Sequence, residues 1–320
     1  MMRLNKTVFL TFGLFGLLLI GFSFTVVAAT PNYQLTLMKG TVEYTVVKYD
    51  DAAWKATVNP SSNPKQFFHG DANVTGAKSK QTVKGWVDTT FSTYQAMLSL
   101  YFSLNEYIAW QSFNLTAKGY NETKINENYP NEYSVWSGIS AEWYFTKSAY
   151  PETPNSSVTP IVILKNPSDY KSILDDCNAI IDEIWNDTSL VTIKYAFSPN
   201  KTADGFAWQL VTYGFGVLSP RDTYLETMVS DLGCVNTTAS GSTLIFDKTG
   251  VTDYSIVVTY GSNGLLSAFV VKDASDNIIY QITSSNSDWL FYTLLFSFIG
   301  ASAVLIVYVI VRKRKIRKST

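Results

Sequence analysis

His69 is the only histidine in this 320-residue chain, which makes it the first candidate for acid–base chemistry. A Ser-His-Asp or Cys-His mechanism needs a group that orients the imidazole, and the neighbours Phe67, Phe68 and Gly70 offer none. The chain also contains no Gly-x-Ser-x-Gly elbow and no P-loop. We therefore interpret His69 as a loop histidine and assign no catalytic residue.

The 26 carboxylates are a second source of chemistry. Asp169, Asp176 and Glu183 are seven residues apart and share one face of a helix, which we interpret as a solvated face. They lack the Asp-x-Asp-x-Asp-Gly spacing that wraps ligands around calcium. A glycosidase needs two carboxyl groups held across a sugar cleft, and 26 acids make some such pair inevitable. The carboxylates alone therefore do not indicate an enzyme.

Cys177 and Cys234 are the only cysteines and lie 57 positions apart. In an oxidising compartment they predict a disulfide, worth about 4 kcal/mol in the chain-entropy model. Two separate buried thiols are the alternative. One histidine and two cysteines are too few ligands for zinc, and Gly214-Phe-Gly216 lacks the third glycine of a dinucleotide-binding loop. We predict no metal and no cofactor.

Aromatic side chains make up 15% of the chain and crowd one stretch of it. That stretch contains Tyr129, Tyr133, Trp136, Trp143, Tyr144 and Tyr150. Trp and Tyr can pack on a sugar or peptide while keeping a polar group available. Trp136, Trp143 and Tyr144 are therefore candidate binding residues, and packing within the core is the alternative.

Seven Asn-x-Ser/Thr sequons predict glycosylation of an exported protein, and several lie in polar, turn-like sequence where a glycan can face water. The sequons are at Asn73, Asn114, Asn121, Asn155, Asn186, Asn200 and Asn236.

The formal net charge of −1 hides an uneven distribution. Residues 30–288 contain all 26 acids and 17 of the 25 bases, which gives this part a net charge of −9. The other eight bases flank two apolar segments at the ends of the chain. An acidic body does not bind nucleic acid through a basic face, so we exclude nucleic acid as a partner.

The two apolar segments predict the lipid bilayer as a partner. Residues 289–311 carry no charge over 23 residues and would extend about 35 Å as a helix, which predicts a transmembrane helix. Residues 312–320 follow as a basic cytoplasmic tail. Residues 1–29 predict a signal peptide, with an uncleaved signal anchor as the alternative because the apolar run is long. Both alternatives place residues 30–288 outside the cell. Small residues around Gly300 allow homo-oligomerisation through the membrane helix.

Residues 30–150 are expected to form a first lobe of the exported body. Alternating apolar residues predict strands over 33–49 and 133–146. Ser103 and Glu106 match a capping box, which predicts a helix over 104–118 that ends before Gly119. The conformation of residues 87–103 stays open, because part of this segment also alternates like a strand. Prolines at 151, 154 and 160 mark the boundary with a second lobe over 151–288.

The second lobe is expected to contain two helices. One opens at Asn166-Pro167 and carries an isoleucine stripe, and the other runs from Ser219 to Gly233. Strands are predicted at 161–165, 190–197, 206–213, 244–246, 254–260, 265–271 and 278–282. Their order resembles a ferredoxin-like split unit with added strands, and a curved antiparallel sheet cradling helices fits nearly as well.

These patterns predict an α+β fold, with antiparallel sheet and packed helices in an exported ectodomain. The expected protein is a single-pass surface protein in the cell membrane, with its C-terminus in the cytoplasm. We expect its ectodomain to bind an extracellular protein, a glycan or another ligand. A structural component of the cell envelope is one alternative, and an exported hydrolase acting on glycans is another.

Overall fold

The computed structural model describes residues 32–36 and 39–285. The chain divides into two compact units, Met1–Asn32 and Tyr33–Thr320, and the fold described below belongs to the second. The predicted signal segment 1–29, transmembrane helix 289–311 and tail 312–320 lie outside the described residues. Within the two described ranges, no helix combines the length and the apolarity needed to cross a bilayer.

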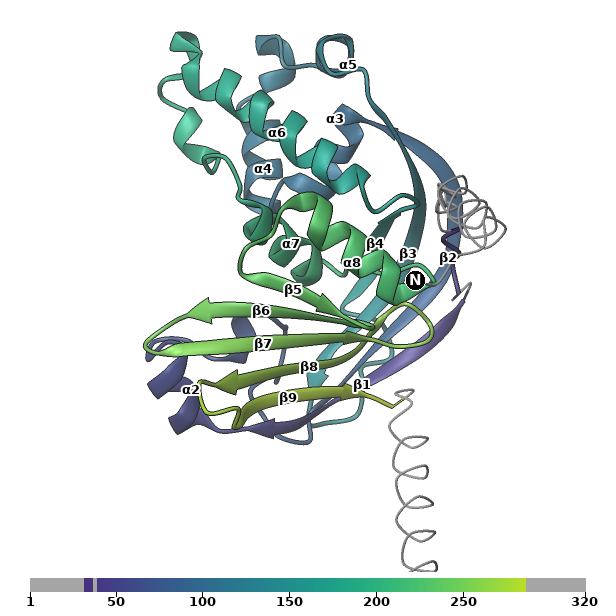
Figure 1. Cartoon of the computed structure of the whole chain (residues 1–320), viewed down its shortest axis with the longest axis vertical. Coiled ribbons are helices and arrows are strands. Elements are labelled where there is room, and N and C mark those ends of the chain that lie inside the picture. Colours follow the sequence, from purple (N-terminus) through teal and green to yellow (C-terminus); the bar gives the residue numbers. More distant parts are fainter. Residues whose placement is uncertain (1–31, 37–38, 286–320) are drawn as a thin grey trace, which may run out of the picture. The chain divides into compact units, whose positions relative to one another are not determined.

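The described residues form an α+β fold on one curled antiparallel sheet, as predicted (Figure 1). Its nine strands run in the order β4-β3-β2-β1-β9-β8-β7-β6-β5. The strands are β1 (Gly40–Tyr49), β2 (Lys78–Ser92), β3 (Glu132–Thr146), β4 (Ser156–Leu164), β5 (Thr237–Ser240), β6 (Thr243–Thr249), β7 (Asp253–Tyr260), β8 (Leu266–Asp273) and β9 (Ile278–Ser284). Because β1 pairs with both β2 and β9, the first strand joins the two halves of the sheet.

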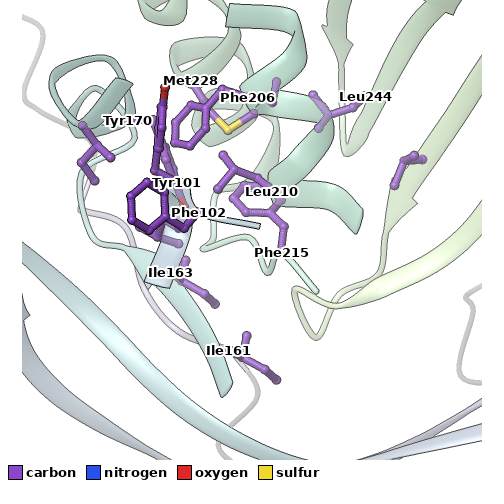
Figure 2. Packing of buried hydrophobic residues seen from close by; sticks show 14 of the residues in the cluster. Tyr101, Phe102, Ile161, Ile163, Tyr170, Phe206, Leu210, Phe215, Met228 and Leu244 are labelled. Atoms are coloured by element: carbon purple, nitrogen blue, oxygen red, sulfur yellow. The ribbon is translucent and has the colours of Figure 1, made fainter. Parts of the chain in front are cut away.

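Helices pack against this sheet. They are α2 (Asp51–Thr57), α3 (Thr93–Ala96), α4 (Leu104–Ser112), α5 (Glu122–Asn128), α6 (Asp169–Asn186), α7 (Ala203–Thr212) and α8 (Arg221–Leu232), with a π-helical segment at Met97–Tyr101. In Figure 1, β5–β9 lie below α7 and α8, while β2 and β3 curve upward toward α3, α4, α5 and α6. Figure 2 shows part of the core between them, where Tyr101 and Phe102 lie above Ile163 of β4, and Phe206 lies near Met228.

Local signals predicted several elements well. α6 buries its apolar stripe of Ile173, Cys177, Ile180, Ile181 and Ile184. α8 ends at Leu232 and is followed by Gly233, whose φ of 75° is the left-handed conformation that glycine adopts most readily. The capping box that starts α4 is formed, with Glu106 N donating to Ser103 Oγ at 3.2 Å and Ser103 N donating to Glu106 Oε2 at 2.7 Å. The open segment 87–103 turns out to be the end of β2, α3 and the π-helical segment.

The strands predicted over 190–197 and 206–213 are wrong. Residues 188–190 and 194–196 form short 3₁₀ turns, and 203–212 form α7. Short apolar runs do not distinguish a strand from a helix. Here an N-cap favours the helix, because Gly205 N donates to Thr202 Oγ1 at 3.1 Å. Phe206 and Leu210 then lie on one buried helical face. Without these two strands, the order of strands and helices no longer matches a ferredoxin-like split unit.

The proline-containing segment 151–155 connects β3 to β4, which pair in the same sheet. Pro160 lies inside β4, a position that proline tolerates because β4 is an edge strand and needs no further ladder hydrogen bond there.

Gly138 of β3 lies opposite Trp86 of β2, at a place where the strand has no room for a side chain. A Cβ at Gly138 would come within 2.6 Å of two ring carbons of Trp86. We expect Gly138→Ala to lower the free energy of unfolding by about 1–3 kcal/mol, since the indole must move, as measured by urea denaturation. Gly85→Ala on β2 is the matched control, because its Cβ would meet only Lys39 Cε at 3.6 Å. Equal stability of the two variants would contradict this close-packing argument.

Candidate ligand pocket

A pocket of about 680 Å³ lies between the sheet and the helices. Strands β1–β4 and β7–β9 contribute one wall, and the π-helical segment, the start of α4 and the end of α7 contribute another. This volume is within the range of about 300–1,000 Å³ that small-molecule sites occupy in proteins.

Most of the lining is apolar or aromatic. The apolar residues include Phe67, Phe68, Leu98, Leu100, Phe102, Phe145, Val162, Leu210, Phe215, Leu265, Phe269 and Ile282. The π-helical segment is a notable part of the wall, because π-helical turns are rare and occur frequently at functional sites. Its end is held by Gln209 Nε2, which donates to Leu100 O at 2.8 Å and to Tyr101 O at 2.7 Å. These two hydrogen bonds fix the end of the π-helical segment in the pocket wall.

A polar cluster interrupts the apolar lining where β1, β2, β3 and β4 lie side by side. Gln81 Nε2 donates to Glu142 Oε1 at 3.3 Å and to Ser140 Oγ at 3.2 Å. Tyr44 OH lies 3.5 Å from Gln81 Oε1, and Ser140 Oγ donates to Thr159 O at 3.3 Å. Sheet register brings these residues together, since Gln81 pairs with Val42 on one side and Glu142 on the other.

Glu142 is the only carboxylate among the described residues that line this pocket. Burial raises its pKa above the ordinary glutamate value, and this effect outweighs hydrogen bonds from Thr159 and Gln81 and the charge of His69. His69 itself is exposed at the pocket, with its ring centroid 4.7 Å from that of Tyr144. The site therefore offers one half-buried carboxyl group inside an apolar cavity.

A buried ion pair lies behind the helical wall. Lys201 Nζ lies 3.1 Å from Glu106 Oε2, and the side chains are 12% and 4% exposed. Lys201 Nζ also donates to Tyr101 O, the last carbonyl of the π-helical segment. The pair therefore ties α4, the π-helical segment and the start of α7 together at the back of the pocket.

The three predicted binding aromatics do not lie together. Trp143 and Tyr144 line the pocket, whereas Trp136 does not. The Trp143 ring is already covered by Lys80 Nζ at 4.0 Å, and its Nε1 donates to Pro151 O at 3.1 Å. Lys165 Nζ lies over the Trp136 ring, 4.8 Å from its centroid.

Cys177 and Cys234 are free thiols in this structure, the first buried and the second half-buried. Burial raises the pKa of Cys177 well above its ordinary value and raises that of Cys234 to about 12, so neither is a reactive thiolate. The disulfide stays a prediction.

Most of the predicted sequons are accessible. Five asparagines are exposed, namely Asn114, Asn155, Asn186, Asn200 and Asn236. Asn73 and Asn121 are half-buried, and Asn121 Oδ1 caps α5 by accepting from Lys124 N at 2.9 Å. Glycosylation itself stays a prediction.

A second pocket, of about 750 Å³, is polar and lined by five aspartates: Asp204, Asp247, Asp253, Asp273 and Asp276. Asp204 accepts from Val235 N at 3.1 Å and from Asn236 N at 3.0 Å, so it has a structural role beside β5. Over residues 32–36 and 39–285, no group of three His, Cys, Asp or Glu is arranged to hold a metal ion.

Tyr44, Gln81 and Glu142 were not among the residues singled out from the sequence. Glu142 does have a visible signal, since it is the only charged residue between Tyr133 and Thr146. Comparison of the chain with protein-family models, curated proteins and solved structures found no match.

Proposed function

We propose that the exported body is a ligand-binding module, and that its ligand occupies the 680 Å³ pocket. The observation that carries this proposal is the pocket itself: a cavity of the right size, largely apolar, with one polar cluster that can orient a ligand. The apolar walls favour an apolar small molecule over a glycan, because buried sugar hydroxyls need many hydrogen-bond partners.

In this proposal a membrane helix at 289–311 anchors the module to the cell surface, with the tail 312–320 in the cytoplasm. The run of uncharged residues and the following bases support that location. The presence of one carboxyl group in the pocket favours binding over glycan hydrolysis by a carboxylate pair.

Filling the polar end of the pocket tests the proposal. Thr159 lines the pocket on β4, and its neighbour Val158 is 63% exposed and outside the lining. We expect Thr159→Trp to reduce labelling of pocket peptides by a photoreactive twelve-carbon alcohol at least tenfold, because the indole occupies ligand space. Labelling is measured by mass spectrometry on the full chain in nanodiscs.

Val158→Trp is the matched control and is expected to label like the unmodified chain. The proposal fails if the unmodified chain shows no saturable labelling of the pocket. It also fails if Thr159→Trp, with an unchanged circular dichroism spectrum, labels as well as Val158→Trp.

A further inference from the structure

Among the described residues, the charge of His69 lowers the pKa of the Glu142 carboxyl group, but burial raises it by more. Glu142 takes part in none of the ion pairs among the described residues. The other charged side chain of the lining, Lys80, is held elsewhere, with its Nζ 4.0 Å from the Trp143 ring centroid and 4.9 Å from that of Tyr150. A half-buried carboxylate without a counter-ion is costly, so a cation delivered by a ligand would be favoured there.

The rest of the pocket suits a hydrocarbon chain. Its rim carries exposed apolar side chains, with Leu104 70%, Tyr107 40% and Tyr213 47% exposed. Exposed apolar groups that continue into an apolar cavity mark a binding surface for an apolar ligand. The aromatic residues Phe68, Tyr144 and Phe145 also line the pocket, and ring faces attract cations.

We propose that the pocket takes a single-chain amphiphile with an amine head group, whose ammonium binds the Glu142 carboxylate while its chain occupies the apolar lining. This inference rests on the proposed function and specifies its ligand class. The net charge of −9 on residues 30–288 adds long-range attraction for a cationic ligand and repulsion for an anionic one.

Three photoreactive probes with the same twelve-carbon chain test the head group: an amine, an alcohol and a carboxylate. On the full chain in nanodiscs of zwitterionic phospholipid, we expect the amine to half-saturate the pocket at about a tenfold lower concentration than the alcohol, as a charge-assisted hydrogen bond implies. The carboxylate should label most weakly. Adding the probes from water or preloading them in the lipid distinguishes a water-borne from a membrane-borne ligand, and either route supports the head-group assignment.

Glu142→Gln is the decisive variant. It keeps the size and the hydrogen bond from Gln81 but removes the charge, so the amine and the alcohol should become equivalent. Glu152→Gln is the matched control, because Glu152 is an exposed acid between β3 and β4 outside the pocket, and this variant should keep the tenfold preference. The inference is overturned if the unmodified chain does not prefer the amine, or if Glu142→Gln preserves the preference. If no probe labels the pocket, the proposed function itself fails.

The preference should also depend on pH. The amine stays protonated below pH 9, so the group that titrates is Glu142. Glu142 is faced by Tyr44 from β1, by His69 from the loop before β2, and by the neutral side chains of Gln81 and Thr159. Because burial raises the pKa of Glu142, lowering the pH from 8 to 5 should shift this group toward its neutral form and weaken amine labelling without affecting the alcohol. His69→Gln should retain this dependence; its complete loss in that variant would assign the effect to His69 and refute the role of Glu142.

Discussion

Replacing Lys201 with methionine is expected to lower the free energy of unfolding at pH 7 by about 3–5 kcal/mol. The reason is the carboxylate that remains. The Glu106 side chain is 4% exposed and would keep its charge without a cation, supported by hydrogen bonds from Ser103 and from Ser198 N at 3.1 Å. Urea denaturation of the full chain in detergent measures the loss. Lys55→Met is the control, because its partner Asp51 is exposed and such pairs contribute about 0–1 kcal/mol.

The two partners of this ion pair respond differently to their surroundings. Burial raises the pKa of Glu106, but hydrogen bonds from Ser103 and the charge of Lys201 outweigh it, so the pKa lies below its ordinary value. Burial lowers the pKa of Lys201 despite the attraction of Glu106. Glu106 stays ionised because it accepts hydrogen bonds from Ser103 N, Ser198 N and Lys201 Nζ. The pair therefore adds little net stability as a unit, while losing one member is costly.

Stability measurements at low pH and on a double variant distinguish the effect of charge from the effect of packing. A carboxyl group with a lowered pKa stabilises the fold above its unfolded pKa of about 4.3, and this stabilisation disappears as the pH falls through the folded pKa. The stability deficit of Lys201→Met should therefore shrink below about pH 4. Adding Glu106→Gln should recover part of the loss at pH 7. A deficit that is unchanged in the double variant would show that Lys201 acts through packing rather than through the charge.

Elements with a strong period and a recognisable end could be predicted from the sequence. Examples are the apolar stripe on α6, the glycine that follows α8, and the meander β6–β9. The four-residue β5 was missed, because so short a strand has no period to recognise. Residues 206–213 were misassigned because Phe, Trp, Val and Thr favour strands, whereas burial of Phe206 and Leu210 against the core requires a helix.

The pocket depends on information that a local pattern does not contain. Gln81 and Glu142 are 61 residues apart and meet only through the register of β2 and β3. That register is set by burial on both faces of a curled sheet, including the close approach of Trp86 to Gly138. The sequence could thus indicate the aromatic stretch that supplies Trp143 and Tyr144, but not the carboxyl group or the cavity beside them.

Replacing Phe206 with alanine is expected to cost about 3–5 kcal/mol of unfolding free energy, since a fully buried ring is removed and a cavity remains. The Phe206 ring lies 6.0 Å from that of Tyr101 and 6.4 Å from that of Tyr170, so it joins α7 to the π-helical segment and to α6 (Figure 2). Phe206→Leu refills most of the space and should cost about 1 kcal/mol.

This series also tests whether the helices and the sheet form one cooperative unit. Tyr195→Ala is the control for loss of an exposed ring, which is 72% exposed here, and should change stability by no more than about 0.5 kcal/mol. Because Phe206 contacts the end of the π-helical segment that lines the pocket, its removal should shift the unfolding of helices and sheet together, in a single transition by both circular dichroism and tryptophan fluorescence. Two separated transitions, or a loss below about 1 kcal/mol, would show that the helical wall of the pocket is held independently of this core contact.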